Sequence, residues 1–112
     1  MKVYENLYVG EGLEKRKDKI LKKISMGKVQ LNIYVIVLSK SEKNQLEFYD
    51  TSLAVQKIFS FEDTLIVGIA KGYEGAVAVV ETITNDIYTK TKDANIRLYI
   101  LDKQRKFEES RV

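Results

Sequence analysis

Hydrophobic and polar positions change their spacing several times along the chain, and each change predicts an element. Residues 3–9 alternate loosely with a period of two, which is typical of a short, half-exposed strand. Residues 13–26 place apolar side chains at helical spacing, and Gly27 suits the left-handed position that ends many helices. Residues 29–38 are rich in β-branched side chains and nearly unbroken in their second half, so they predict a central strand covered on both faces.

A polar loop at residues 39–44 leads into a second, shorter strand. Residues 46–49 alternate like an edge strand and are placed to pair antiparallel with the strand before them. The Asp, Thr and Ser at residues 50–52 are good helix caps, and they predict a helix of about two turns that ends at Phe59. A short connection then leads to a buried-strand pattern at residues 64–70.

Propensity and periodicity disagree about the segment after Gly72. Its many valines, isoleucines and threonines favour a strand. Its apolar residues nevertheless fall within one arc of a helical wheel, whereas its polar residues would interrupt both faces of a strand of that length. The periodicity decides, and the sequence predicts a helix over residues 73–90. A turn at 92–95, a final strand at 96–101 and a charged, frayed tail at 102–112 complete the expected chain.

The expected element order is therefore β-α-β-β-α-β-α-β in a chain of 112 residues. Alternating strands and helices predict an α/β fold, bordering on α+β, built as a layered sandwich with a mixed sheet. The length is that of one domain, which we expect to span residues 1–101.

Composition removes most catalytic chemistry. The chain contains no histidine and no cysteine, which excludes disulfides, thiolate nucleophiles, imidazole bases and the usual zinc sites. Carboxylate, lysine, tyrosine and hydroxyl chemistry remains, together with oxygen-ligated Mg²⁺ or Ca²⁺. Because no catalytic motif is recognisable either, the sequence favours a non-enzymatic protein without a cofactor or a bound metal.

Two features predict where the protein resides. The amino terminus carries charged residues where a secretory signal would need apolar ones. The longest apolar run, residues 33–38, is far too short to span a bilayer. We therefore expect a cytoplasmic protein without a membrane span.

A glycine-rich corner joins the strand at 64–70 to the helix after it. Backbone N–H groups at a helix start bind anions, so the corner predicts a phosphate or nucleotide site. The hypothetical ligand-binding residues are Lys71, Gly72, Tyr73 and Gly75. A plain structural turn explains them equally, because the spacing matches neither the P-loop nor the dinucleotide fingerprint and Glu74 already places a carboxylate in the first helical turn. Gly68, inside the strand, indicates close packing against a helix.

Positive charge is concentrated in residues 14–28, which hold seven basic and two acidic side chains, a net charge of +5 against +3 for the whole chain. The hypothetical basic face consists of Lys15, Arg16, Lys19, Lys22 and Lys23. Such a face can follow the phosphates of nucleic acid or of an anionic membrane, or it can simply be solvated. It lacks interleaved aromatic or amide side chains, so any nucleic-acid binding is expected to be non-specific and salt-sensitive.

Four carboxylates near the expected short helix define a candidate Mg²⁺ site. They are Glu47, Asp50, Glu62 and Asp63, and two of them with Lys57 or Lys71 would suffice for a Mg²⁺-dependent phosphodiesterase or nuclease. Helix capping by Asp50 and a turn at residues 62–63 explain the same side chains without catalysis.

Seven tyrosines and four phenylalanines make the chain rich in aromatic side chains, which favours association. We expect Tyr34 in the core and one exposed face for Tyr4, Tyr8, Tyr49, Tyr73 and Tyr99. A second copy that covers an open sheet edge would protect that edge. The leading hypothesis is therefore a small interaction or regulatory module that acts as a homo-oligomer or with another protein. A phosphate or nucleotide binder is the alternative, and weak nucleic-acid binding ranks third.

Overall fold

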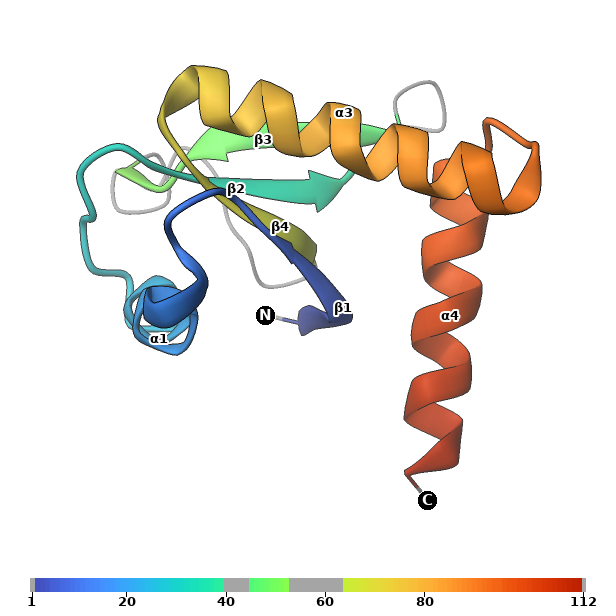
Figure 1. Cartoon of the computed structure of the whole chain (residues 1–112). Helices are drawn as coiled ribbons and strands as arrows, with labels where there is room; N and C mark the ends of the chain where they lie inside the picture. The colour runs from blue at the N-terminus through green and yellow to red at the C-terminus, as the bar shows by residue number, and fades with distance from the viewer. Residues whose placement is uncertain (1, 40–44, 53–63, 112) are drawn as a thin grey trace.

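The computed structural model describes residues 2–39, 45–52 and 64–111, and these residues contain one mixed sheet. Its strands, in the spatial order β1-β4-β2-β3 (Figure 1), are β1 (Lys2–Val9), β2 (Ile33–Leu38), β3 (Leu46–Asp50) and β4 (Leu65–Lys71). β4 runs parallel to β1 and antiparallel to β2. β2 pairs antiparallel with β3, as the sequence predicted.

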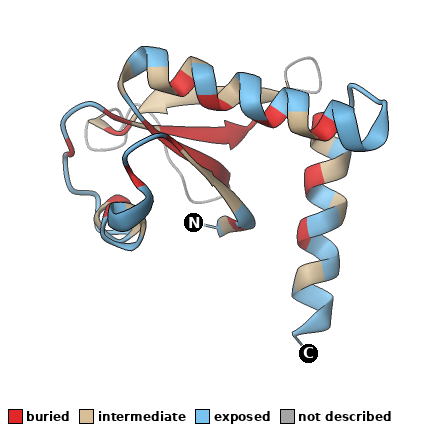
Figure 2. Cartoon of the chain, in the orientation of Figure 1, coloured by how far each residue is buried: buried red, intermediate tan, exposed pale blue. Residues whose placement is uncertain are grey.

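Helices cover both faces of this sheet. One face carries α1 (Lys17–Ser25), which follows a short 3-10 turn, η1 (Glu14–Arg16), so the helix expected over residues 13–26 starts with that turn. The opposite face carries α3 (Gly72–Thr91) and the first half of α4 (Ile96–Ser110). Figure 2 shows β2 and β4 as mostly buried segments between these layers. The predicted α/β class and layered arrangement are confirmed.

β2 is the central strand that its sequence predicted. Val35 and Val37 belong to the core beneath α1, while Ile36 and Leu38 belong to the core beneath α3. The strand begins later than predicted because Asn32 adopts a left-handed conformation, with a φ of 63°, which an extended strand does not allow.

β4 contains a bulge beside β2. The pairing with β2 skips one residue of β4 between Ile66 and Gly68. A Cβ atom on Gly68 would lie 3.0 Å from Cγ1 of Val79 in α3 and 3.2 Å from the backbone oxygen of Tyr8 in β1. The close packing that the sequence predicted for this glycine is therefore confirmed.

α3 confirms the helix predicted over residues 73–90. Its buried residues, spaced three or four apart, are Ala76, Val79, Ile83 and Ile87. Two exposed threonines, Thr82 and Thr84, donate their hydroxyl groups to backbone carbonyls four residues earlier. Burial of a continuous apolar face outweighs the strand preference of the β-branched residues.

The final strand predicted at residues 96–101 is wrong, because these residues begin α4. Asn95 caps the helix, since its side-chain oxygen accepts a hydrogen bond from the backbone N–H of Leu98 at 3.0 Å. The buried residues that follow are spaced four apart, which is a helical period, and they are Ile96, Ile100 and Gln104. A strand would have buried Leu98 together with both isoleucines, but Leu98 is 63% exposed.

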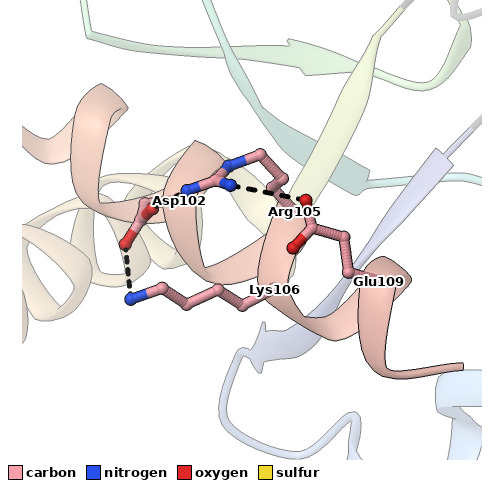
Figure 3. Close-up of polar contacts among 4 residues, drawn as sticks. All are labelled: Asp102, Arg105, Lys106 and Glu109. Carbon is pink, nitrogen blue, oxygen red and sulfur yellow. Dashed lines mark hydrogen bonds and ion pairs between the residues drawn. The ribbon is translucent and has the colours of Figure 1, made fainter.

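The charged tail expected from Asp102 onward is helical up to Ser110. Figure 3 shows Arg105 in contact with Asp102 at 2.6 Å and with Glu109 at 3.4 Å. Lys106 contacts Asp102 at 3.1 Å, and hydrogen bonds from Lys106 and Arg105 hold the pKa of Asp102 below its usual value. Opposite charges three and four positions apart face each other on a helix, so this charged sequence supports the last turns of α4.

α4 covers the outer edge of β1 (Figure 1). The buried side chain of Gln104 accepts a hydrogen bond from the backbone N–H of Glu5 at 3.0 Å. Lys2 pairs with Glu108 at 3.2 Å. A free strand edge is a template for unwanted pairing, and this contact protects one side of the sheet from it.

Two tyrosines differ from expectation. Tyr4, expected to keep an exposed face, is only 3% exposed because it lies in the core beneath α3 and α4. Tyr34, expected in the core, is half-buried and packs against that same core from its margin.

Some expected elements lie outside the described residues, namely most of the polar loop, most of the helix expected to end at Phe59, and the connection at 60–63. No helix in the described parts of the chain is long and apolar enough to cross a bilayer.

Candidate functional site

β1 and β4 lie side by side and run parallel, but the chain leaves them toward opposite faces of the sheet. After β1 it continues to α1 on one face, and after β4 it continues directly into α3 on the other. The crevice outside the carboxyl ends of two such strands is where open α/β sheets bind ligands.

A groove of about 470 Å³ lies at this place, which is within the size range of small-molecule sites. One wall is formed by the end of β1 and the residues after it, and the other by the first turns of α3. The lining residues are Tyr8, Val9, Gly10, Glu11, Lys71, Gly75, Ala78, Val79 and Thr82.

The β1 wall lies close to β4 because Gly10 has no side chain. Its N–H donates to the backbone oxygen of Ile69 at 2.8 Å, and a Cβ atom on it would lie 3.1 Å from Cα of Ala70. Gly12 then adopts a φ of 85° that redirects the chain toward α1. Glu11, between the two glycines, is exposed at the rim of the groove.

The α3 wall begins at the predicted corner. Gly72 adopts a φ of 76°, and its N–H donates to the backbone oxygen of Asn32 at 2.8 Å, so this glycine serves the turn itself. No side chain in the described ranges caps the first turn of α3. The exposed Lys71 stands directly beside that turn and lines the groove. Backbone N–H groups without a cap and a neighbouring ammonium group both suit an anion.

Gly75 lies in the first turn of α3, where neither backbone nor packing requires a glycine. It does not have a positive φ, and the described atom nearest to an added Cβ would be Cβ of Ala70 at 3.8 Å, an ordinary contact. Glycine within a helix costs about 0.5–1 kcal/mol relative to alanine. The absent side chain leaves the groove wider at this point.

Tyr8 is held in place at the bottom of the β1 wall. Its hydroxyl donates to a carboxylate oxygen of Asp86 in α3. Burial and this carboxylate raise the pKa of Tyr8, while the hydrogen bond from Tyr8, assisted by Lys90, lowers the pKa of Asp86. Tyr8 is therefore a neutral phenol at neutral pH, and its hydroxyl hydrogen is already donated to Asp86.

The structure brings together only part of the predicted ligand site. Lys71 and Gly75 line the groove, but Gly72 and Tyr73 do not. Tyr73 turns to an aromatic cluster in which its ring centroid lies 5.4 Å from that of Phe48 and 6.5 Å from that of Tyr34. The prediction from sequence did not include the β1 wall. The only signal for this wall was the pair of glycines after the first strand.

The residues of the predicted basic face surround α1 on its solvent side. Lys15 and Arg16 lie in η1 and are exposed, as are Lys19 and Lys22 in α1, whereas Lys23 is half-buried. The face opposite to them packs on the sheet through Ile20 and Ile24.

The candidate Mg²⁺ site gains no support from the described carboxylates. Glu47 accepts hydrogen bonds from the hydroxyls of Ser39 and Tyr49, and its presence raises the pKa of Tyr49 to about 12. Asp50 accepts a hydrogen bond from the backbone N–H of Ser52 at 3.0 Å, as a capping residue does. The other members of the candidate, Lys57, Glu62 and Asp63, lie outside the described residues. Across the ranges that the structure describes, no group of three or more acidic side chains is placed to hold a metal ion.

No family model matches the chain, and neither a curated protein nor a solved structure matches it significantly.

Proposed function

We propose that this protein binds a small molecule with an anionic group, such as a phosphate or a nucleotide, in the groove between the ends of β1 and β4. Lys71 and the first turn of α3 would contact the anionic group, and the β1 wall would hold the rest of the ligand. Two parallel strands whose chains leave toward opposite faces provide the topological support for this position. We also propose that the protein is cytoplasmic, as its sequence favours.

The observation that carries this proposal is Gly75. Neither the backbone angles nor a described neighbour requires a glycine at this position. A glycine within a helix lowers the stability of that helix relative to alanine. Functional sites are places where natural chains violate such local preferences. Here the space belongs to the groove, directly beside Lys71.

The charges of the groove define its ligand class. Glu11 and Lys71 carry opposite charges at the rim, and Glu74 is exposed in the same helical turn as Gly75. A highly charged ligand would meet the carboxylate of Glu11 in the groove, so a ligand with one anionic group and a neutral or partly cationic body fits better. A nucleoside monophosphate is therefore favoured over a triphosphate.

Ligand screening with two variants tests this function. Nucleoside mono-, di- and triphosphates and inorganic phosphate are screened by thermal shift and then by calorimetry. Lys71→Ala is expected to weaken binding roughly tenfold to a hundredfold, since a hydrogen bond to a charged group is lost. Gly75→Ala is expected to raise the midpoint of thermal unfolding by a few degrees while also weakening binding, because its methyl group occupies the groove.

Lys103→Ala is the matched control for the first variant, since Lys103 is an exposed lysine on α4, away from the groove. If no phosphate compound binds, or if binding is unchanged in both Lys71→Ala and Gly75→Ala, the groove does not serve this function.

A second candidate function is self-association, which the aromatic cluster of Tyr34, Phe48 and Tyr73 favours. Phe48 of this cluster lies in β3, the strand at the opposite edge of the sheet from β1. Tyr73 is 63% exposed, and partly exposed aromatic groups are enriched in protein interfaces. A two-fold axis near β3 would pair this cluster with its own copy.

Analytical ultracentrifugation tests the second candidate. We expect the wild type to form a dimer and Tyr73→Ala to weaken it by roughly tenfold or more, as for a central interface tyrosine. Tyr88→Ala is the matched control, because Tyr88 is a 53% exposed tyrosine near the other end of the same helix. A strictly monomeric wild type at high concentration would contradict this function.

A further inference from the structure

The loop between α1 and β2 reverses the usual placement of polar and apolar side chains. Within it, Gln30 is 8% exposed, whereas Val29 on one side is 56% exposed and Leu31 on the other is 90% exposed. Met26, at the start of the loop, is 54% exposed. Figure 2 shows most of this loop, at the left of the view, as exposed chain.

Hydrogen bonds on both sides hold the loop in this orientation. The amide of Gln30 donates to the backbone oxygen of Ile20 in α1 at 3.2 Å, and the hydroxyl of Thr51 donates to the backbone oxygen of Gln30 at 3.2 Å. At the end of the loop, Asn32 accepts the hydrogen bond from Gly72. Leu31 is thus displayed by an anchored backbone, and a rotation that buried it would expose Gln30 and break these contacts.

Exposed cations lie in the same loop as the displayed aliphatic side chains and in the helix before it. Lys28 is exposed within the loop, and Lys22 is exposed in the last turns of α1 directly before it. Further exposed cations of the basic face on η1 and α1 are Lys15, Arg16 and Lys19. Figure 1 places α1 and this loop together at one end of the molecule.

We propose that this end of the protein docks reversibly on an anionic lipid bilayer, with Leu31 and Val29 inserted at the boundary between headgroups and acyl chains. The exposed lysines of the loop and of α1 would contact lipid phosphates and carboxylates. Aliphatic side chains on one surface together with lysines are the combination that binds peripheral proteins to anionic membranes. The proposal is independent of the groove and of its ligand.

A bilayer accounts for this surface better than nucleic acid does. Single-stranded nucleic acid binds through aromatic side chains on which bases stack, and residues 10–33 contain no aromatic residue. Leucine and valine cannot stack on bases, but they gain free energy on entering an apolar phase. A protruding loop also suits a soft, deformable surface more than the shape-matched surface of a folded protein.

An introduced tryptophan tests the insertion directly, since the chain contains none. Leu31→Trp is mixed with phosphatidylcholine vesicles that contain or lack phosphatidylserine, and tryptophan emission is recorded. We expect a blue shift with the anionic vesicles, and no shift with pure phosphatidylcholine. Leu98→Trp is the matched control, because Leu98 is a 63% exposed leucine on α4, and its emission is expected to stay unshifted.

Vesicle co-sedimentation separates the contributions. Leu31→Ser is expected to weaken binding of the wild-type chain roughly tenfold, and Lys22→Glu with Lys28→Glu to abolish it. Added salt is expected to release the protein from the vesicles. Absence of binding to anionic vesicles at low salt overturns the proposal, as does binding that Leu31→Ser leaves unchanged. Binding to single-stranded RNA in place of vesicles would assign the basic face to nucleic acid instead.

Discussion

Replacing Ile100 by alanine is expected to lower the free energy of unfolding by about 2–4 kcal/mol, because the side chain is fully buried and its removal leaves a cavity. Ile100 belongs to the core beneath α3 and α4, together with Ile83 and Ile87. Chemical denaturation monitored by far-ultraviolet circular dichroism gives the measurement.

Leu98→Ala is the matched control, and it also distinguishes the helix from the strand that the sequence suggested. In α4 Leu98 is 63% exposed, so its truncation is expected to cost well under 1 kcal/mol. In a strand, Leu98 and Ile100 would lie on the same face, and both substitutions would be costly. Equal losses for the two variants would therefore contradict the helix.

Replacing Gly68 by alanine is expected to lower the free energy of unfolding by about 1–3 kcal/mol, because the added methyl group overfills a closely packed contact. It would lie 3.0 Å from Cγ1 of Val79, and the backbone oxygen of Tyr8 at 3.2 Å limits its retreat on the other side. Thermal and chemical unfolding both report this loss.

A double-mutant cycle identifies the cause of that loss. In a Val79→Ala background the nearest obstacle to the new methyl group is removed, so the cost of Gly68→Ala is expected to fall, though not to vanish, because the oxygen of Tyr8 remains. Gly75→Ala is expected to change the free energy of unfolding in the opposite direction and to raise it. Its methyl group would meet only an ordinary contact, Cβ of Ala70 at 3.8 Å. A Gly68→Ala variant as stable as the wild type would show that the bulge in β4 relaxes freely.

The contrast between α3 and α4 shows which signals in the sequence suffice. The apolar residues of α3 keep a helical spacing over twenty residues. This periodicity outweighs the strand preference of its valines and threonines. At residues 96–101 the apolar run is short. Ile96, Leu98 and Ile100 occupy every second position, as the apolar residues of a strand do. The deciding information lay outside that run, in the cap at Asn95 and in Gln104, a polar residue that continues the buried stripe.

The candidate site depended on strand order, which no local pattern specifies. Lys71 and Gly75 were recognisable because they follow one strand directly. Glu11 and Tyr8 face them only because β1 pairs with β4, a strand more than fifty residues away in the chain. Likewise, the inverted loop at Gln30 contradicts its own hydropathy, and only contacts from Ile20 and Thr51 reveal its orientation.

The contact between α4 and β1 also limits how far an assembly that grows by pairing sheet edges could extend. If two copies join through β3, the doubled sheet ends on both sides in a β1 strand that already has a helix beside it. A third copy then finds no strand to extend, so growth terminates at a closed pair and cannot proceed to fibres.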